Sequence, residues 1–187
     1  MSKNIEGGLL SYLSEKDDWK KIATHNDKEI KGFFDNCRFL SNFGPAKVFL
    51  DGEEYNSVEN AYQAAKYKKE LRIYLMICSP REATAFAKEN IDGKCSNEEW
   101  ENKKLEVMRK LLIQKFDKNL NPENYQKLLE TGSKYLEETN YWGDTYWGVD
   151  KNDAKEYGNG KNNLGKLLME IRNNIIKKAT ETSAESI

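Results

Sequence analysis

The chain has 187 residues, of which 38% are hydrophobic and 33% charged, and 30 Lys and Arg residues against 31 Asp and Glu residues leave a net charge of −1. This length suits one domain with its own core, and the balanced charge argues against a general affinity for nucleic acid or membrane surfaces. The chain has a single histidine and three widely spaced cysteines, which exclude the usual zinc sites. It has no apolar run long enough for a membrane span, so we expect a cytoplasmic protein without a metal.

The first strong signal along the chain is a β-hairpin. Residues 1–30 are polar with scattered apolar positions, and we expect them to form an extension that packs on the domain. Residues 47–50 and 53–55 are predicted to form two strands around Asp51-Gly52, because this dipeptide is typical of the tight turn in a hairpin.

Helices are predicted for most of the remaining chain. Asn56 resembles a helix N-cap with Glu59 three residues later, which predicts a capping box and a helix over about 57–69. Ser79-Pro80 opens a second helix, with serine as the cap and proline at the first position. Apolar residues at helical spacing predict further helices over about 97–116, 122–130 and 164–177, followed by a polar, fraying tail at 179–187. The fold class is therefore mainly α (α+β), with one helical domain over 31–178 and a small β-hairpin or sheet.

The helix after the hairpin carries the first candidate site. Glu59, Gln63 and Lys66 stand at positions i, i+4 and i+7, so they share one helix face, with Tyr62 beside them. This pattern has two interpretations that the sequence leaves open. The face is either a capping glutamate with a solvated polar stripe, or a carboxylate and an amine held over a pocket.

The second candidate site is a glycine-bearing aromatic stretch at 141–150. Trp142 and Trp147 lie in two YWG triplets five residues apart, with Asp144 between them. Aromatic side chains on loops favour stacking of a base or a sugar, whereas packing of both tryptophans in the core is the structural alternative. Residues 158–163 then lead into the last helix and form a weak candidate for a phosphate cradle.

Several blocks of the sequence together resemble the YbiA-like, or NADAR, family of small N-glycosidases. They occur in order between about residues 32 and 176, and the residues outside them include the first 30. The blocks are FLSNF at 39–43, SVE at 57–59 with Gln63 and Lys66, Ser79-Pro80, Trp100 with Met108, LLETG at 128–132, WGDTYWG at 142–148 and GKNNLGKLLMEIR at 160–172.

The resemblance implies a mainly helical fold whose pocket cleaves an N-glycosidic bond to a ribose without a cofactor. Some family members act on early riboflavin-pathway intermediates, which are ribosylamino-pyrimidine phosphates, and others remove ADP-ribose from modified guanine in nucleic acid. Position by position, the resemblance implies Glu59, Asp144 and Lys66 as catalytic residues. The expected substrate-binding residues are Arg38, Asn42, Phe43, Tyr62, Gln63, Trp100, Trp142, Trp147, Gly148 and Asn162.

Cleavage of such a bond passes through a state with positive charge on the sugar, which a carboxylate near the C1 atom stabilises. Glu59 and Asp144 are the hypothesised carboxylates, and which of them acts as base or nucleophile and which as acid stays open. Lys66 has two possible roles, because it can hold a substrate phosphate or orient Glu59 as an ammonium, or capture the opened ribose as an imine.

Two other classes of protein compete with the enzyme hypothesis. A binding module would hold ADP-ribose or a nucleotide through aromatic and phosphate contacts without needing the carboxylates. A nucleic-acid-binding domain is disfavoured by the balanced charge. The expected partner is a ribosylated base or nucleotide, including ADP-ribosylated DNA as one possibility, and no membrane is expected; the sequence does not indicate an oligomeric state.

Overall fold

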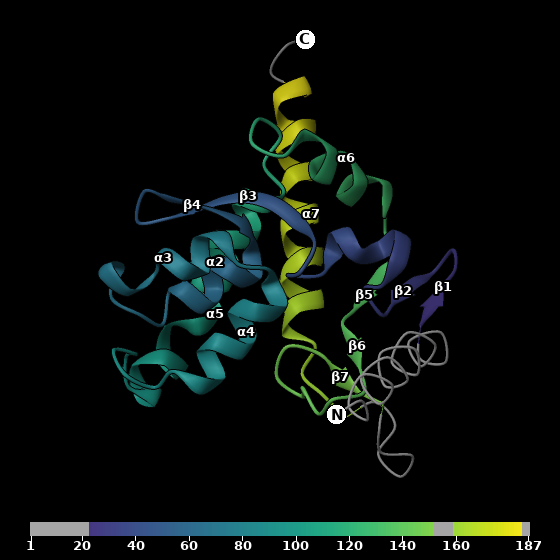
Figure 1. The fold of residues 1–187 in the computed structure, drawn as a ribbon. Coiled ribbons are helices and arrows are strands. Elements are labelled where there is room, and N and C mark those ends of the chain that lie inside the picture. Colours follow the sequence, from purple (N-terminus) through teal and green to yellow (C-terminus); the bar gives the residue numbers. More distant parts are fainter. Residues whose placement is uncertain (1–22, 152–158, 185–187) are drawn as a thin grey trace, which may run out of the picture. The chain divides into compact units, whose positions relative to one another are not determined.

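The computed structural model describes residues 23–151 and 159–184, and these form mainly helices with a few short strands (Figure 1). The predicted α+β class with helices in the majority is confirmed. The chain divides into two compact units, of which the first comprises residues up to Cys37 together with Ser133–Lys166. The second unit comprises Arg38–Gly132 and the chain from Leu167 onward.

The predicted hairpin opens the second unit. Strands β3 (Pro45–Leu50) and β4 (Glu53–Ser57) pair antiparallel. Asp51 and Gly52 connect them with φ angles of 52° and 83°. Two successive positive φ angles match the right-handed twist of the strands, and Asp-Gly tolerates them better than most dipeptides. The prediction of this hairpin is confirmed.

Helix α2 (Val58–Ala64) follows β4 directly, and it differs from the predicted helix at both ends. Its N-cap is Ser57, whose side-chain oxygen accepts a hydrogen bond from the Asn60 backbone N–H, so the predicted capping box of Asn56 and Glu59 is wrong. Asn56 instead belongs to β4. The helix ends at Ala64 rather than near residue 69, and all of its residues are buried, which makes α2 the core helix of this unit.

The other helices are the 3-10 helix η1 (Asp35–Leu40), η2 (Lys69–Leu71), α3 (Ile73–Ile77), α4 (Pro80–Glu89), α5 (Asn97–Lys115), α6 (Pro122–Glu130) and α7 (Asn163–Ala184). The predicted α4, α5 and α6 are confirmed, and Ser79 and Glu82 form a capping box at the start of α4. Helix α7, yellow in Figure 1, continues to Ala184, so the predicted end near residue 177 is too early.

The first unit contains short strands that the sequence analysis did not predict. β1 (Thr24–His25) pairs antiparallel with β2 (Glu29–Lys31), and β2 pairs parallel with β5 (Tyr135–Glu137). β6 (Thr139–Asn140) and β7 (Val149–Asp150) form a second parallel pair. The predicted packing of residues 1–30 as an extension stays a prediction, since 1–22 lie outside the described residues.

Two further findings concern the described residues as a whole. None of the helices in 23–151 and 159–184 combines the length and the apolar character that a membrane crossing requires. Within the same ranges, no three His, Cys, Asp or Glu side chains are grouped so that they could hold a metal ion.

Candidate active site

A chain of hydrogen bonds begins on one face of α2 and continues to the turn that follows this helix. The Gln63 side-chain Nε2 donates to Glu59 Oε1 at 2.7 Å, and Lys66 Nζ donates to Gln63 Oε1 at 2.6 Å. The structure therefore brings together the three residues that share this face in the sequence, with the amide of Gln63 linking a carboxylate to an amine. Glu59 and Gln63 are 7% and 6% exposed, so this is a buried polar cluster rather than a solvated stripe.

Helix α4 adds a residue that the sequence analysis missed. The Thr84 hydroxyl oxygen lies 2.7 Å from Glu59 Oε1 and 3.1 Å from the Pro80 carbonyl oxygen. A carboxylate that accepts hydrogen bonds from both an amide and a hydroxyl is stabilised in its ionised form. The capping signal at Ser79 predicted where α4 begins, but nothing local to that segment indicates that Thr84 faces α2.

Two aromatic rings enclose the amine of Lys66. Tyr62 of α2 and Trp100 of α5 pack edge to face, with ring centroids 4.9 Å apart. Lys66 Nζ lies 5.3 Å from the Tyr62 centroid and 5.2 Å from the Trp100 centroid, which is within the range of cation–π interactions. The structure thus brings two of the predicted substrate-binding aromatics to the predicted amine.

The surroundings of Lys66 lower the pKa of its amine below the ordinary value of 10.5. Burial is the main cause, the negative charge of Glu59 opposes it, and the positive charges of Lys94 and Lys104 add to the lowering. Burial favours the neutral amine, which is the nucleophilic form, while the three lysines together favour an anionic group beside them. Both roles considered for Lys66 are compatible with this environment.

The lowered pKa predicts that Lys66 makes the stability of the fold depend on pH. Between the lowered pKa and 10.5, the unfolded chain holds a proton on Lys66 that the folded chain has released, so stability rises with pH in this window. The free energy of unfolding of the wild type should therefore increase relative to that of Lys66→Met as the pH is raised toward 10.5. Urea unfolding at about pH 7 and about pH 10 measures this difference. Lys110→Met, at an exposed lysine of α5, is the control, and parallel behaviour of wild type and Lys66→Met would contradict the prediction.

The segment 38–43, which comprises the end of η1 and the residues after it, lies against the first turn of α2. The Glu59 backbone N–H donates to the Asn42 carbonyl oxygen at 3.1 Å, and the fully buried Lys115 donates from Nζ to the Ser41 carbonyl oxygen at 2.6 Å. Asn42 is 8% exposed, and its side-chain Oδ1 has no hydrogen-bond partner among the described residues. A buried, unpaired amide oxygen is costly, so Asn42 Oδ1 is well suited to accept a hydrogen bond from a ligand.

Arg38 and Phe43, the other two predicted site residues of the segment 38–43, contact each other. The Arg38 guanidinium carbon lies 5.9 Å from the centroid of the Phe43 ring, at the outer limit of a cation–π contact. Arg38 is exposed and Phe43 is half-buried, so both remain available to a ligand.

In the first unit, Asp144 closes a turn in the aromatic stretch. Its Oδ1 accepts hydrogen bonds from the backbone N–H groups of Tyr146 at 3.0 Å and Trp147 at 2.8 Å. Asn140 holds the same turn from the other side, since its Nδ2 donates to the Asp144 carbonyl oxygen at 2.8 Å. Trp142 is 56% exposed, while Trp147 and Asp144 are half-buried. The carboxylate thus has a structural task in shaping this loop.

Gly148 and Asn162 have clear structural reasons for their identities. A Cβ atom at Gly148 would lie 2.2 Å from the Glu138 carbonyl oxygen, so no larger residue fits. Asn162 accepts from the Glu138 N–H through Oδ1 and donates from Nδ2 to the Leu136 carbonyl oxygen at 2.9 Å. These contacts favour a structural role for Asn162 over a substrate contact.

The suggested phosphate cradle before α7 is not supported. The backbone N–H groups of residues 161–164 donate to the carbonyl oxygens of Thr145, Gly148, Tyr146 and Trp147 respectively. Because these groups are already used within the loop, they are not available to a phosphate. Residue 158, the first of this stretch, lies outside the described residues.

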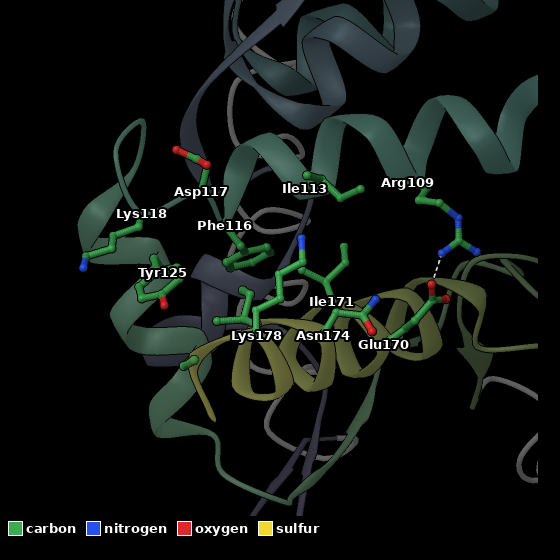
Figure 2. A pocket seen from close by; sticks show the side chains of 12 residues that line it. Arg109, Ile113, Phe116, Asp117, Lys118, Tyr125, Glu170, Ile171, Asn174 and Lys178 are labelled. Atoms are coloured by element: carbon green, nitrogen blue, oxygen red, sulfur yellow. Dashed lines mark hydrogen bonds and ion pairs between the residues drawn. The ribbon is translucent and has the colours of Figure 1, made fainter. Parts of the chain in front are cut away.

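A separate groove of about 620 Å³ lies between α5, α6 and α7 in the second unit (Figure 2). Ile113, Phe116 and Ile171 form its apolar part, an ion pair of Arg109 and Glu170 lies at one end, and Lys178 extends over it. None of the predicted site residues is among the residues that line it. The groove is therefore distinct from the cluster on α2.

The fold and the cluster define a small α+β protein that buries a carboxylate and an amide on its core helix, with a half-buried amine in the turn that follows this helix. The NADAR domain model matches residues 23–176, so the chain belongs to the NADAR family, as the sequence blocks predicted. The chain is 34% identical over 139 residues to N-glycosidase YbiA of Escherichia coli (strain K12), covering 71% of this chain and 78% of that protein.

Two further comparisons agree with this membership. A riboflavin biosynthesis protein of Vibrio vulnificus (strain YJ016) is 32% identical over 146 residues, which are 78% of this chain and 37% of that protein. The NMR structure of the Escherichia coli protein YbiA matches with a TM-score of 0.69 and 29% identity, over 87% of this chain and 94% of that chain. Sequence and fold therefore place the chain beside proteins named as N-glycosidases.

Proposed function

We propose that this protein is an N-glycosidase that hydrolyses the bond between a base and a ribose or phosphoribose, and we expect it to act in the cytoplasm. Membership of the NADAR family and likeness to the named N-glycosidases support this class of reaction. The observation that carries the proposal is the buried Glu59 carboxylate, which accepts two hydrogen bonds and is linked through Gln63 to Lys66.

The proposed reaction breaks the C1–N bond, with its electron pair leaving on the base nitrogen and positive charge developing on the sugar. Water supplies a hydroxyl group to C1 and gives its second proton to one of two carboxyl groups, while the other carboxyl group, in its protonated form, gives its proton to the departing base. Glu59 and Asp144 are the proposed carboxylates. A negative charge next to C1 lowers the energy of the oxocarbenium-like state, which is the contribution we assign to Glu59.

Two substrate groups fit this proposal. The first group is the ribosylamino-pyrimidine phosphates of riboflavin synthesis, which the family resemblance suggests and with which the name of the Vibrio vulnificus relative, a riboflavin biosynthesis protein, agrees. The resemblance to the wider family supports ADP-ribosylated guanine. Both contain a phosphorylated ribose, and the lysines around Lys66 provide positive charge for an anionic group.

Incubation of the protein with both substrates tests the proposal directly. Mass spectrometry of the products should detect a free base and a free sugar phosphate or ADP-ribose in at least one case. A wild-type protein that binds either ligand but releases no base would contradict the proposal and support a binding module instead. Binding of DNA that weakens steeply with added salt would point to a nucleic-acid-binding domain.

Borohydride trapping separates the two roles considered for Lys66. If the amine attacks the aldehyde of the opened ribose, loss of water gives an imine, and borohydride reduces that imine to a stable secondary amine. Peptide mapping of an active sample should then find the sugar adduct on Lys66 and not on Lys178, which extends over the separate groove (Figure 2). An active protein without an adduct leaves Lys66 as a cation that holds phosphate or orients Glu59.

A further inference from the structure

The Thr84 hydroxyl lies between two acceptors. Its oxygen is 2.7 Å from Glu59 Oε1 and 3.1 Å from the carbonyl oxygen of Pro80, one helical turn earlier in α4. A hydroxyl group has one proton to donate and two lone pairs that accept. Thr84 can therefore donate to only one of these oxygens at a time.

We propose that Thr84 is a positioning residue that keeps Glu59 in place in both of its protonation states. When Glu59 is ionised, the hydroxyl donates its proton to Oε1. When Glu59 has taken up a proton, the hydroxyl rotates to donate to Pro80, and its oxygen accepts the new proton of the carboxyl group. The inference rests on the proposed function, in which Glu59 gains or loses a proton during the reaction.

Gln63, which also donates a hydrogen bond to this oxygen, cannot serve both states. Gln63 donates from Nε2 to Glu59, and its Oε1 is occupied by the Lys66 amine at 2.6 Å. This contact fixes the orientation of the amide, so Gln63 offers Glu59 a donor and no acceptor. Of the two, only Thr84 can accept a proton from a neutral Glu59.

The anchoring of α4 makes Thr84 suitable for this task. Ser79 and Glu82 form a reciprocal capping box, and Pro80 occupies the first turn, so the carbonyl that receives the rotated hydroxyl is held in place. The other titratable groups around the cluster are Lys66 just after α2, Lys104 of α5 with its ion-pair partner Glu101, and Lys94 and Cys95 between α4 and α5. Replacing Thr84 with valine removes none of these charges, so a change in the titration of Glu59 in that variant is due to loss of the hydroxyl group.

Thr84→Val, which removes the hydroxyl and keeps the shape, is the main test, with Thr84→Ala as a second variant should valine prevent folding. We expect kcat to fall about tenfold or more with KM changed less than about threefold. The limb of the pH–rate profile that reports Glu59 should move to higher pH, because the ionised carboxylate loses a charge-assisted hydrogen bond, which is stronger than the bond that the neutral carboxyl group loses. Thr84→Ser should keep the wild-type profile.

Thr180→Val is the matched control, because Thr180 also bonds to a carbonyl one turn earlier in its helix, that of Ile176 at 2.9 Å, on the exposed part of α7. This variant should change neither kcat nor the pH profile. A threonine needed only for folding would lower stability without moving the profile. An active Thr84→Val protein with the wild-type profile would overturn the proposal while leaving the proposed function intact.

Carbon-13 NMR of the Glu59 carboxyl group provides a readout that does not require activity. The signal is assigned by its loss in Glu59→Gln, and its titration is compared between wild type and Thr84→Val. The midpoint should move to higher pH in the variant, and an unmoved midpoint would overturn the proposal. If the wild type releases no base from either substrate, the proposed function fails, and the titration still tests the role of Thr84.

Discussion

Glu59→Gln is expected to reduce the rate of base release by about a thousandfold while the protein remains folded. The substitution keeps the size and shape of the side chain and removes its negative charge. The new amide oxygen can still accept hydrogen bonds from Gln63 and Thr84, so the cluster loses its ability to stabilise positive charge on the sugar rather than its packing. Initial rates of base release, measured by chromatography on the substrate that the wild type cleaves, give the effect.

Glu123→Gln is the matched control for this prediction. Glu123 lies on α6, where its carboxylate pairs with Lys127 at 2.6 Å on the exposed surface. Removing this charge should change the rate of release less than twofold. Asp144→Asn tests the second proposed carboxylate in the same assay. A Glu59→Gln protein that retains a tenth or more of the wild-type rate would refute the assignment of Glu59.

The features that the sequence predicted correctly are those set by short stretches of chain. Asp51-Gly52 determines the hairpin turn by its tolerance of positive φ, and Ser79 and Glu82 determine the start of α4 through their own backbone contacts. Glu59 and Gln63 come together because helical spacing puts them on one face, and Lys66 reaches Gln63 from the turn directly after Ala64. Such features need no knowledge of the rest of the fold.

The features that the sequence did not predict depend on segments that are distant in the chain. β2 pairs in parallel with β5, more than 100 residues later, and strands of two or three residues carry too little pattern to be recognised. Thr84 faces Glu59 only because α4 packs on α2. The predicted helix N-cap lies one residue too early, because strand β4 continues through Asn56 and leaves Ser57 as the cap.

Asn60→Ala is expected to lower the free energy of unfolding by about 3 kcal/mol or more. Asn60 of α2 is fully buried, and its Nδ2 donates to the carbonyl oxygens of Leu75 and Cys78, both at 2.9 Å. These carbonyls lie at the end of α3, where a helix leaves its last carbonyl groups without partners in the helix itself. Alanine would leave two buried acceptors unpaired and a cavity beside them.

The same substitution also tests how the helix that carries Glu59 is held in the fold. Asn60 directly follows Glu59 on α2, and every residue of this helix is buried. Urea unfolding followed by circular dichroism measures the loss in stability. Asn124→Ala is the control, since Asn124 also donates from Nδ2 to a carbonyl oxygen, that of Pro45 at 3.0 Å, but on the exposed surface where water replaces the lost donor. We expect that control to change stability by less than about 0.5 kcal/mol. Equal effects of the two substitutions would show that the bonds of Asn60 do not anchor α2 to α3.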